Sequence, residues 1–316
     1  MRNAGMIPVA VCDIDADRCA AAKADFPDIE TYATVDALLL NGNADLITII
    51  TPHDSHTGVA LQCINAGKHV VIEKPITITT DQCDSLIEAS RRNNVVLSTY
   101  HNRHWDGHIL EALEHIRNGE IGDVFRIECH MGSYDQPGTW WRSQRSVSGG
   151  ILYDWGVHLL EYALQILSPS EMTEVSGYAK DGFWAGTLPF PDDANEDEGY
   201  LVVRFTDKRW LTLSVSSIDS HNKADRGILE ITGTSGTYLM FFDKWMIKSV
   251  SGGILTTREG KNQVGQTEKF YENILGTIQG TAELTITPEW ARRPVHILDL
   301  AVKSSALGYA QKSKYA

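Results

Sequence analysis

GKHVVIEKP, residues 67–75, is the stretch that decides the fold of this chain. Its glycine is suited to ending a helix, and the apolar run that follows is typical of a strand buried inside a parallel sheet. Proline cannot extend a central strand, so Glu73 and Lys74 should lie at the carboxyl end of this one. Because ligands bind at that edge of open α/β sheets, Lys74 is a candidate for chemistry. The alternative is a solvated lysine at the end of a strand.

Similar strands flank this stretch on both sides. Residues 44–52 form a continuous apolar run that also stops at a proline, and residues 95–100 form another. Helical patterns at residues 54–65 and 80–92 separate the three strands. Strands and helices that alternate at this spacing predict right-handed βαβ units, and therefore a doubly wound, Rossmann-like parallel sheet.

An earlier strand, at residues 8–13, ends in Asp13, and a helix to about Phe26 follows it. An aspartate in this position can bind the hydroxyl groups of an adenosine ribose, as it does in dinucleotide-binding folds. The alternative is an aspartate that only forms a turn. Turn-forming aspartates are common, and the residue taken alone favours that alternative.

The pattern changes after Tyr100. A helix to about residue 118 and a strand at residues 124–131 lead into a loop rich in glycine, tryptophan and arginine. A strongly apolar helix is expected next, at residues 150–166. Residues 173–250 then read as antiparallel strands with turn signals between them. The second half of the chain should therefore be α+β.

Two helices, at about residues 267–279 and 288–310, finish the chain, and Thr287 before Pro288 is a plausible N-cap. The acidic loop at residues 192–198 is expected to be a solvated connection, and the alternative is a metal site. Length and pattern together predict two domains. Residues 1–102 should form the Rossmann-like α/β domain, and residues 103–316 an α+β domain with a mostly antiparallel open sheet.

The composition excludes several classes of function. A net charge of −13 argues against nucleic acid or an anionic membrane as a partner. No window approaches 18 uncharged apolar residues, and the first residues lack the pattern of a signal peptide. The five cysteines form no CxxC pair, so we expect most of them to be small core residues of a cytoplasmic protein, and we expect no metal site. They are Cys12, Cys19, Cys63, Cys83 and Cys129.

Asp154 and His158 form the second candidate site. They are four residues apart within the expected apolar helix, a spacing that puts both on one face and within reach of each other. Histidine titrates near neutral pH and can accept a proton from an alcohol. A neighbouring carboxylate would orient it and favour its charged form. The alternative is a structural pair with satisfied hydrogen bonds.

These motifs occur together in a fixed order: Thr51-Pro52 with His56, then Glu73-Lys74-Pro75 after the GKHV strand, Tyr100-His101-Asn102-Arg103, Trp141-Arg142, Asp154-x-Gly-x-His158 and the two final helices. In that order and spacing they resemble the glucose–fructose oxidoreductase / inositol dehydrogenase / MocA family, over nearly the whole chain. The resemblance implies an NAD(P)-binding domain and a substrate domain whose open sheet often packs in homodimers or homotetramers. It also implies an enzyme, a dehydrogenase that reversibly oxidises a secondary alcohol on a sugar, cyclitol or related polyol.

The resemblance also implies roles for single residues. Lys74 would bind the reacting oxygen, His158 would be the acid and base, and Asp154 would orient the histidine or the substrate. Asp13 would bind the adenosine ribose and favour NAD over NADP, because a 2′-phosphate would meet a like charge. The other residues implied at the cofactor are Thr51, Pro52, His56, Glu73 and Lys74. The residues implied at the substrate are Asn102, Arg103, Trp141 and Arg142.

The chain departs from this family in one respect. The family begins with a strand and a GxGxxG turn that feeds a helix, and residues 1–6 lead directly into what should be the second strand. That turn and helix N-terminus receive the pyrophosphate, and the first strand is central in the sheet. Either the true start lies upstream of Met1, or the chain has lost dinucleotide binding. The first is favoured because every downstream catalytic element is kept.

Three functions remain open from the sequence. The leading one is an NAD-dependent polyol or sugar dehydrogenase. A second is an NAD-assisted glycosidase, in which the bound sugar is oxidised and then reduced again. A third is a non-catalytic sugar-binding protein that holds no cofactor.

Overall fold

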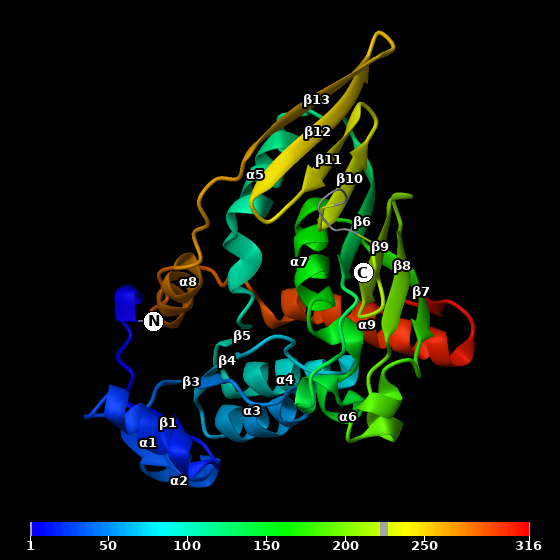
Figure 1. Ribbon diagram of the computed structural model, residues 1–316. Helices are drawn as coiled ribbons and strands as arrows, with labels where there is room; N and C mark the ends of the chain where they lie inside the picture. Colours follow the sequence, from blue (N-terminus) through cyan, green and yellow to red (C-terminus); the bar gives the residue numbers. More distant parts are fainter. Residues whose placement is uncertain (1, 222–226, 316) are drawn as a thin grey trace.

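The computed structural model describes residues 2–221 and 227–315. Its first half contains short parallel strands that alternate with helices (Figure 1). One sheet pairs β1 (Ala10–Cys12) with β2 (Glu30–Tyr32), and a second contains β3 (Leu46–Ile49), β4 (His69–Ile72) and β5 (Leu97–Thr99) in that order. The helices of this half are α1 (Ala16–Asp25), α2 (Val35–Asn41), α3 (His56–Asn65) and α4 (Thr80–Asn93).

Residues 67–75 form the strand that the sequence predicts. Gly67 has φ 74°, the left-handed conformation in which a helix can end, and β4 follows it. β4 is the middle strand of its sheet, and Val70, Val71 and Ile72 are fully buried. The expected parallel α/β architecture, with strands that end at prolines, is confirmed.

The parallel strands are divided between two sheets. Within the described residues, β1 pairs only with β2, and β3 pairs only with β4. β1 and β3 therefore share no neighbouring strand among the described residues. Ile14 and Ile50, which follow β1 and β3, have 96% and 72% of their surface exposed. The sequence patterns did not predict β2 or α2, because β2 is short and its first two residues are exposed.

The second half is built around a sheet that has nine strands within the described ranges. Their order is β13-β12-β11-β10-β6-β9-β8-β7-β14, and all neighbours are antiparallel except β6 and β9. The strands are β6 (Val124–Gly132), β7 (Met172–Lys180), β8 (Glu198–Phe205), β9 (Trp210–Ser216), β10 (Leu229–Gly233), β11 (Gly236–Met240), β12 (Lys244–Ser251), β13 (Ile254–Lys261) and β14 (Gln311–Lys312). The predicted α+β architecture with a mostly antiparallel sheet is confirmed.

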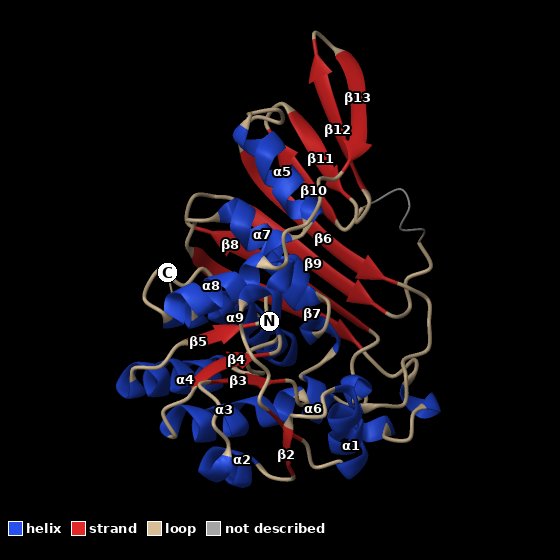
Figure 2. Ribbon diagram, turned by 90° about the vertical axis from the view of Figure 1, so that its left-hand side faces the viewer, coloured by secondary structure: helices blue, strands red, loops and turns tan. Residues whose placement is uncertain are grey.

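Helices cover one face of this sheet (Figure 2). They are α5 (Gly107–Arg117), α7 (Gly156–Leu167) and α9 (Pro288–Leu307), and a short helix, α6 (Arg145–Ser148), lies in the loop before α7. The remaining helix, α8 (Lys269–Ile278), packs instead against Val71 of β4. Leu159, Leu160 and Ala163 of α7 pack into the core of the sheet. None of the described helices combines the length and the apolar character that a membrane crossing requires.

Helix α9 belongs to the cores of both halves. It begins as predicted, with Thr287 as N-cap accepting from Trp290 N and Pro288 at the first helical position. Ala291 and Val295 pack with β3, β4 and β5, whereas Ile297 and Leu298 pack with the large sheet. The domain boundary after residue 102 stays a prediction, because α9 holds the two halves together.

Gly177 provides a test of this packing. A Cβ atom on Gly177, in β7, would lie 2.1 Å from the backbone oxygen of Ala301 in α9. We therefore expect Gly177→Ala to lower the free energy of unfolding by about 1–3 kcal/mol, because backbone must move. The control is Gly58→Ala in α3, where the new Cβ meets nothing within 4 Å and helix propensity should add up to about 1 kcal/mol. Urea unfolding measures both, and equal effects would contradict this packing.

Candidate active site

The carboxyl ends of the parallel strands carry most of the predicted cofactor residues. Asp13 follows β1, Thr51 and Pro52 follow β3, and Glu73 and Lys74 follow β4. Parallel strands present their carboxyl ends at one edge of a sheet, which is the ligand-binding edge in open α/β folds. Thr51 is exposed there, while Glu73 and Lys74 are half-buried.

Lys74 joins the two halves of the chain through Asp154. Its Nζ donates to Asp154 Oδ1 at 2.6 Å and to the Asp154 carbonyl oxygen at 3.0 Å. Arg142 donates to the same Oδ1 at 2.9 Å. Burial would raise the pKa of Asp154, but the Lys74 ammonium and then Arg142 outweigh it and hold that pKa below its ordinary value. Lys74 is thus a fixed cation with 11% of its side chain exposed.

His158 lies beside these charges in the first turn of α7. Only 8% of its surface is exposed, and Nδ1 has no hydrogen-bond partner within the described chain. Burial lowers the pKa of His158 well below its ordinary value of 6.5, and the positive charge of Lys74 lowers it further. The imidazole is therefore neutral at neutral pH and is able to accept a proton.

Two expectations about Asp154 and His158 are wrong. α7 begins at Gly156, so Asp154 precedes the helix and does not share a face of it with His158. The carboxylate also does not favour the charged histidine, because burial and the neighbouring cations dominate and lower the pKa of His158. In the described residues, Asp154 pairs with Lys74 and Arg142 instead. The catalytic roles of the pair stay predictions.

The residues after β5 border the same site. Arg103 lies over the ring of Trp155 at 5.2 Å and donates to Asp106 Oδ2 at 3.1 Å, and Asn102 beside it is half-buried. His101 was not among the predicted site residues. It is buried, neither of its ring nitrogens has a partner in the described chain, and burial lowers its pKa to about 4.

A cavity of about 330 Å³ opens beside Asp154. Trp140, Trp155 and Arg142 line it together with Asp154. The Arg142 guanidinium lies 5.2 Å from the Trp140 ring and 4.7 Å from the Trp141 ring, so the predicted substrate loop reaches this cavity. Lys74 and His158 do not line the cavity but contact two residues that do, because Lys74 is bonded to Asp154 and the His158 ring lies 5.6 Å from the Trp155 ring.

The acidic loop at residues 192–198 is not the solvated connection that the sequence suggested. Asn195 and Glu196 line the cavity, and the Asn195 amide donates to the Arg142 carbonyl oxygen at 2.7 Å. Asp197 is 2% exposed and accepts from the backbone N–H groups of Phe183 and Trp184. Within residues 2–221 and 227–315, no group of three or more histidine, cysteine or acidic side chains is placed to hold a metal ion.

Two histidines hold the strand ends in place. His56 is fully buried, and its ring nitrogens contact the carbonyl oxygens of Thr51 and Pro75, both at 2.9 Å. It can therefore shape a cofactor cleft only indirectly. His53, which the sequence reading missed, contacts the Ser148 carbonyl oxygen at 2.8 Å and lines the cavity. Its position directly after Pro52 was the available signal.

Two carboxylates complete the strand-end edge. Asp13 accepts from Asp15 N at 2.9 Å, has 27% of its side chain exposed, and lies 3.7 Å from the Arg18 guanidinium. Glu73 accepts from Lys74 N at 2.9 Å, and burial raises its pKa. The Asp13 carboxylate thus stays partly exposed to a ligand. The Glu73 carboxylate, in contrast, is hydrogen-bonded to the backbone N–H of Lys74.

Models of known protein families match both halves of the chain. A family described as "Oxidoreductase family, NAD-binding Rossmann fold" matches residues 2–101, and one described as "GFO/IDH/MocA C-terminal domain" matches residues 109–239. The oxidoreductase YdgJ of Escherichia coli is 28% identical over 90% of this chain and 85% of its own length. The scyllo-inositol 2-dehydrogenase (NADP(+)) IolW of Bacillus subtilis is 32% identical over 49% of this chain. That match spans 44% of IolW, and the chain spans less than half of several curated relatives.

Solved structures share the fold over nearly the whole chain. An NAD-binding protein from Listeria innocua superposes with a TM-score of 0.80 at 25% identity and covers 96% of this chain and 89% of its own. Levoglucosan dehydrogenase, solved with NADH and levoglucosan, gives a TM-score of 0.80 at 17% identity and covers 98% of this chain and 90% of its own. At 17% identity, the similarity to levoglucosan dehydrogenase shows only that the fold is shared.

Proposed function

This chain belongs to the Gfo/Idh/MocA oxidoreductase family, and from that premise we propose that it transfers hydride between a secondary alcohol of a sugar, cyclitol or polyol and a nicotinamide cofactor. One observation carries the proposal. The Lys74 ammonium is fixed at 2.6 Å from Asp154, at the ligand-binding edge of a parallel sheet, beside a buried and neutral His158.

The chemistry of oxidation follows from these side chains. Lys74 uses two N–H bonds on Asp154, and its third is available to the hydroxyl oxygen of a substrate. His158 takes the hydroxyl proton, and the ammonium stabilises the negative charge that develops on the oxygen. When bound, the nicotinamide supplies the hydride acceptor. Asp154 positions Lys74 and, with Arg142, lines the cavity proposed for the substrate.

The described residues fit the two ends of a dinucleotide. Asp13 would hold the adenosine ribose, and Thr51, Pro52 and Glu73 would line the cleft toward the nicotinamide. None of the described residues forms the glycine turn that receives a pyrophosphate, and the 316 residues contain no GxGxxG. Ile14 and Ile50, which follow β1 and β3, are exposed and would be available to contact a bound cofactor.

The cavity supports a polyol as the substrate class. Trp140 and Trp155 provide apolar faces, while Arg142, Asp135, Asn195 and Ser217 provide hydrogen-bonding groups. Flat apolar faces combined with a few polar groups suit a ring that carries hydroxyl groups. The relatives named as scyllo-inositol and levoglucosan dehydrogenases are consistent with this class.

We expect NAD to be preferred over NADP because of Asp13. A 2′-phosphate would meet this carboxylate, although Arg18 lies 3.7 Å from it. The dissociation constant for NADPH should exceed that for NADH by about tenfold or more. Asp13→Asn should reduce the ratio of these two constants. Titration of cofactor fluorescence measures both constants. The control is Asp25→Asn at the far end of α1, and equal affinities in the unsubstituted chain would contradict the preference.

We also expect a homodimer or homotetramer through the outer face of the large sheet. Trp210 alternates with the buried Leu211 along β9, and Tyr178 points the same way from β7, with 36% and 61% of their surfaces exposed. Sedimentation velocity should give a multiple of 35.0 kDa, and Trp210→Glu should shift it toward the monomer. A monomer in the unsubstituted chain would refute this assembly.

A panel of polyols and sugars tests the proposed reaction. At least one member should reduce NAD, measured by the absorbance of NADH, and scyllo-inositol and levoglucosan belong in the panel. Release of a glycosidic leaving group with no net NADH would instead indicate an NAD-assisted glycosidase. Binding of a sugar without any cofactor would indicate the non-catalytic alternative.

A further inference from the structure

A second cavity, of about 290 Å³, lies against the first turns of α9 and shares no residue with the cavity beside Asp154. Two adjacent arginines, Arg292 and Arg293, line it. The other lining residues are Met172, Thr287, Glu289, Trp290, His296 and Tyr315. Nothing in the proposed dehydrogenase reaction uses this group of residues.

Arg293 has no acidic partner among the described residues. It donates to the Ser170 carbonyl oxygen at 3.1 Å and lies 5.2 Å from the centre of the Trp290 ring. No carboxylate in the described parts of the chain forms an ion pair with it, and burial lowers its pKa without any acidic group to offset the effect. A half-buried cation without a counter-charge is costly, and most of the five guanidinium N–H donors stay available.

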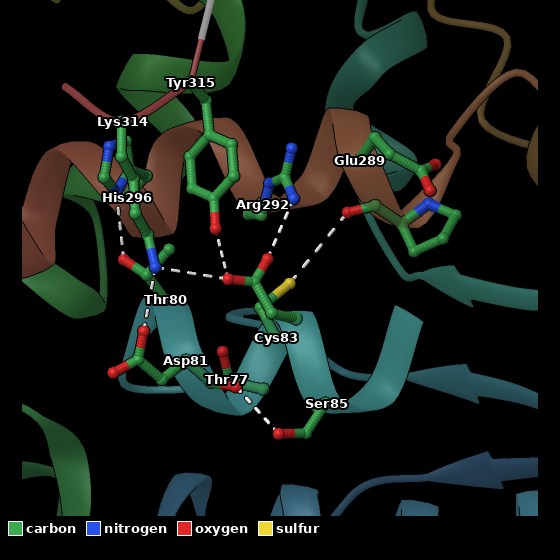
Figure 3. A network of polar contacts seen from close by, with 12 residues as sticks. Thr77, Thr80, Asp81, Cys83, Ser85, Glu289, Arg292, His296, Lys314 and Tyr315 are labelled. Carbon is green, nitrogen blue, oxygen red and sulfur yellow. Dashed lines mark hydrogen bonds and ion pairs between the residues drawn. The ribbon is translucent and has the colours of Figure 1, made fainter. Parts of the chain in front are cut away.

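The other charges around this cavity are already balanced. Arg292 donates to Asp84 Oδ1 at 2.8 Å, and its guanidinium lies 3.6 Å from the centre of the Tyr315 ring. Figure 3 shows Tyr315 and Arg292 pointing from the C-terminal segment and α9 toward α4, where the Tyr315 hydroxyl also donates to Asp84. Lys314 is bonded to Asp81 at 2.9 Å.

The acidic residue of the cavity is also paired. Glu289 accepts from Arg91 at 2.7 Å, so its charge is met from outside the cavity. His296 is held by Thr80 and Ser313, and burial lowers its pKa to about 4, so it is neutral at neutral pH. The charge of Arg293 is therefore left unmatched.

We propose that this cavity binds a small oxyanion, held by the Arg293 guanidinium with Arg292 on the adjacent wall. A planar guanidinium binds phosphate and carboxylate groups through paired hydrogen bonds. The volume lies near the lower end of the range for small-molecule pockets, about 300–1,000 Å³, which suits a small anion better than a nucleotide. Phosphate and carboxylate share this chemistry.

Trp290 makes the site observable. Its ring faces Arg293, and its indole N–H donates to Glu161 Oε1 at 3.2 Å. Glu161 is 1% exposed and also accepts from His104 at 2.6 Å, so the indole is held in one environment. An anion bound to Arg293 should therefore change the fluorescence of Trp290.

Fluorescence titration with inorganic phosphate, at an ionic strength kept constant with chloride, tests the proposal. We expect saturable binding that becomes at least about tenfold weaker in Arg293→Gln. Arg92→Gln removes the same charge from α4, outside the cavity, and should bind as the unsubstituted chain does. Arg293→Lys keeps a cation and should bind more tightly than Arg293→Gln, which separates loss of the site from loss of folding.

A parallel titration with acetate distinguishes the two sources of the ligand. Saturation by phosphate alone would identify a phosphate site, and saturation by acetate would identify a carboxylate site. Absence of saturation by either anion, or equal affinity in Arg293→Gln and Arg92→Gln, would overturn the proposal. Neither outcome depends on cofactor or on dehydrogenase activity.

Discussion

Replacement of Lys74 by methionine is expected to lower kcat on the order of 10²–10³-fold, which is the usual effect of removing one donor that stabilises a developing oxyanion. Methionine keeps the length and apolar character of the stem but removes the ammonium. That group is the strand-end cation bonded to Asp154 at 2.6 Å, and in our account it contacts the reacting oxygen. The loss should appear in kcat more than in KM, because the charge on the oxygen develops during reaction.

The fold should survive this substitution. Asp154 keeps its bond to Arg142 at 2.9 Å and has 44% of its side chain exposed, so no buried carboxylate is left unpaired. Lys68→Met is the matched control, because Lys68 precedes the same strand at its amino end. If Lys74→Met were as active as Lys68→Met, Lys74 would have no role in the reaction.

Replacement of His158 by asparagine should lower the rate of alcohol oxidation on the order of 10²–10⁴-fold, the range for loss of a general base. It should also change the pH profile. Because the pKa of His158 is lowered from 6.5, the neutral base persists below that pH, and kcat/KM should fall only at more acidic pH as the imidazole becomes protonated. In His158→Asn, this acidic limb should disappear.

Two measurements check this assignment. The pH dependence of kcat/KM should show the acidic limb in the unsubstituted chain and in His115→Asn. His115, on α5, is the control because it is a largely buried histidine whose ring contacts Glu120. NMR titration of the imidazole should show the pKa of His158 rising in Lys74→Met, because one of the cations that lower it is gone. An acidic limb that persists unchanged in His158→Asn would assign the base to another group.

The sequence was sufficient to predict the apolar strands β1, β3, β4 and β5 and the residues that follow them, but not the short strand β2. The apolar run before Glu73 and the proline after Lys74 are local signals, so β4 and the position of Lys74 could be predicted. The bond from Lys74 to Asp154 joins residues 80 positions apart, and no local pattern encodes it. Lys74 and Asp154 could therefore be predicted as candidate site residues, but the bond between them could not.

The two incorrect predictions from the sequence also have physical causes. Spacing suggested that Asp154 and His158 share a helix, but the turn Ile151–Tyr153 delays α7 until Gly156. Composition suggested a solvated loop at residues 192–198, but Asp197 is buried because it caps the backbone of Phe183 and Trp184. In the first case a local turn delayed the helix, and in the second a tertiary contact outweighed the local pattern.

Transfer of deuterium from a polyol to the cofactor is the decisive measurement for the proposed hydride transfer. The polyol identified by the panel would be deuterated at the carbon that is oxidised, and the NADH formed would be analysed by mass spectrometry. We expect one deuterium in each NADH, a primary isotope effect on the rate, and much slower transfer in Lys74→Met and His158→Asn. Formation of NADH without deuterium would contradict direct hydride transfer. Transfer in both variants at the rate of the unsubstituted chain would contradict the roles proposed for Lys74 and His158.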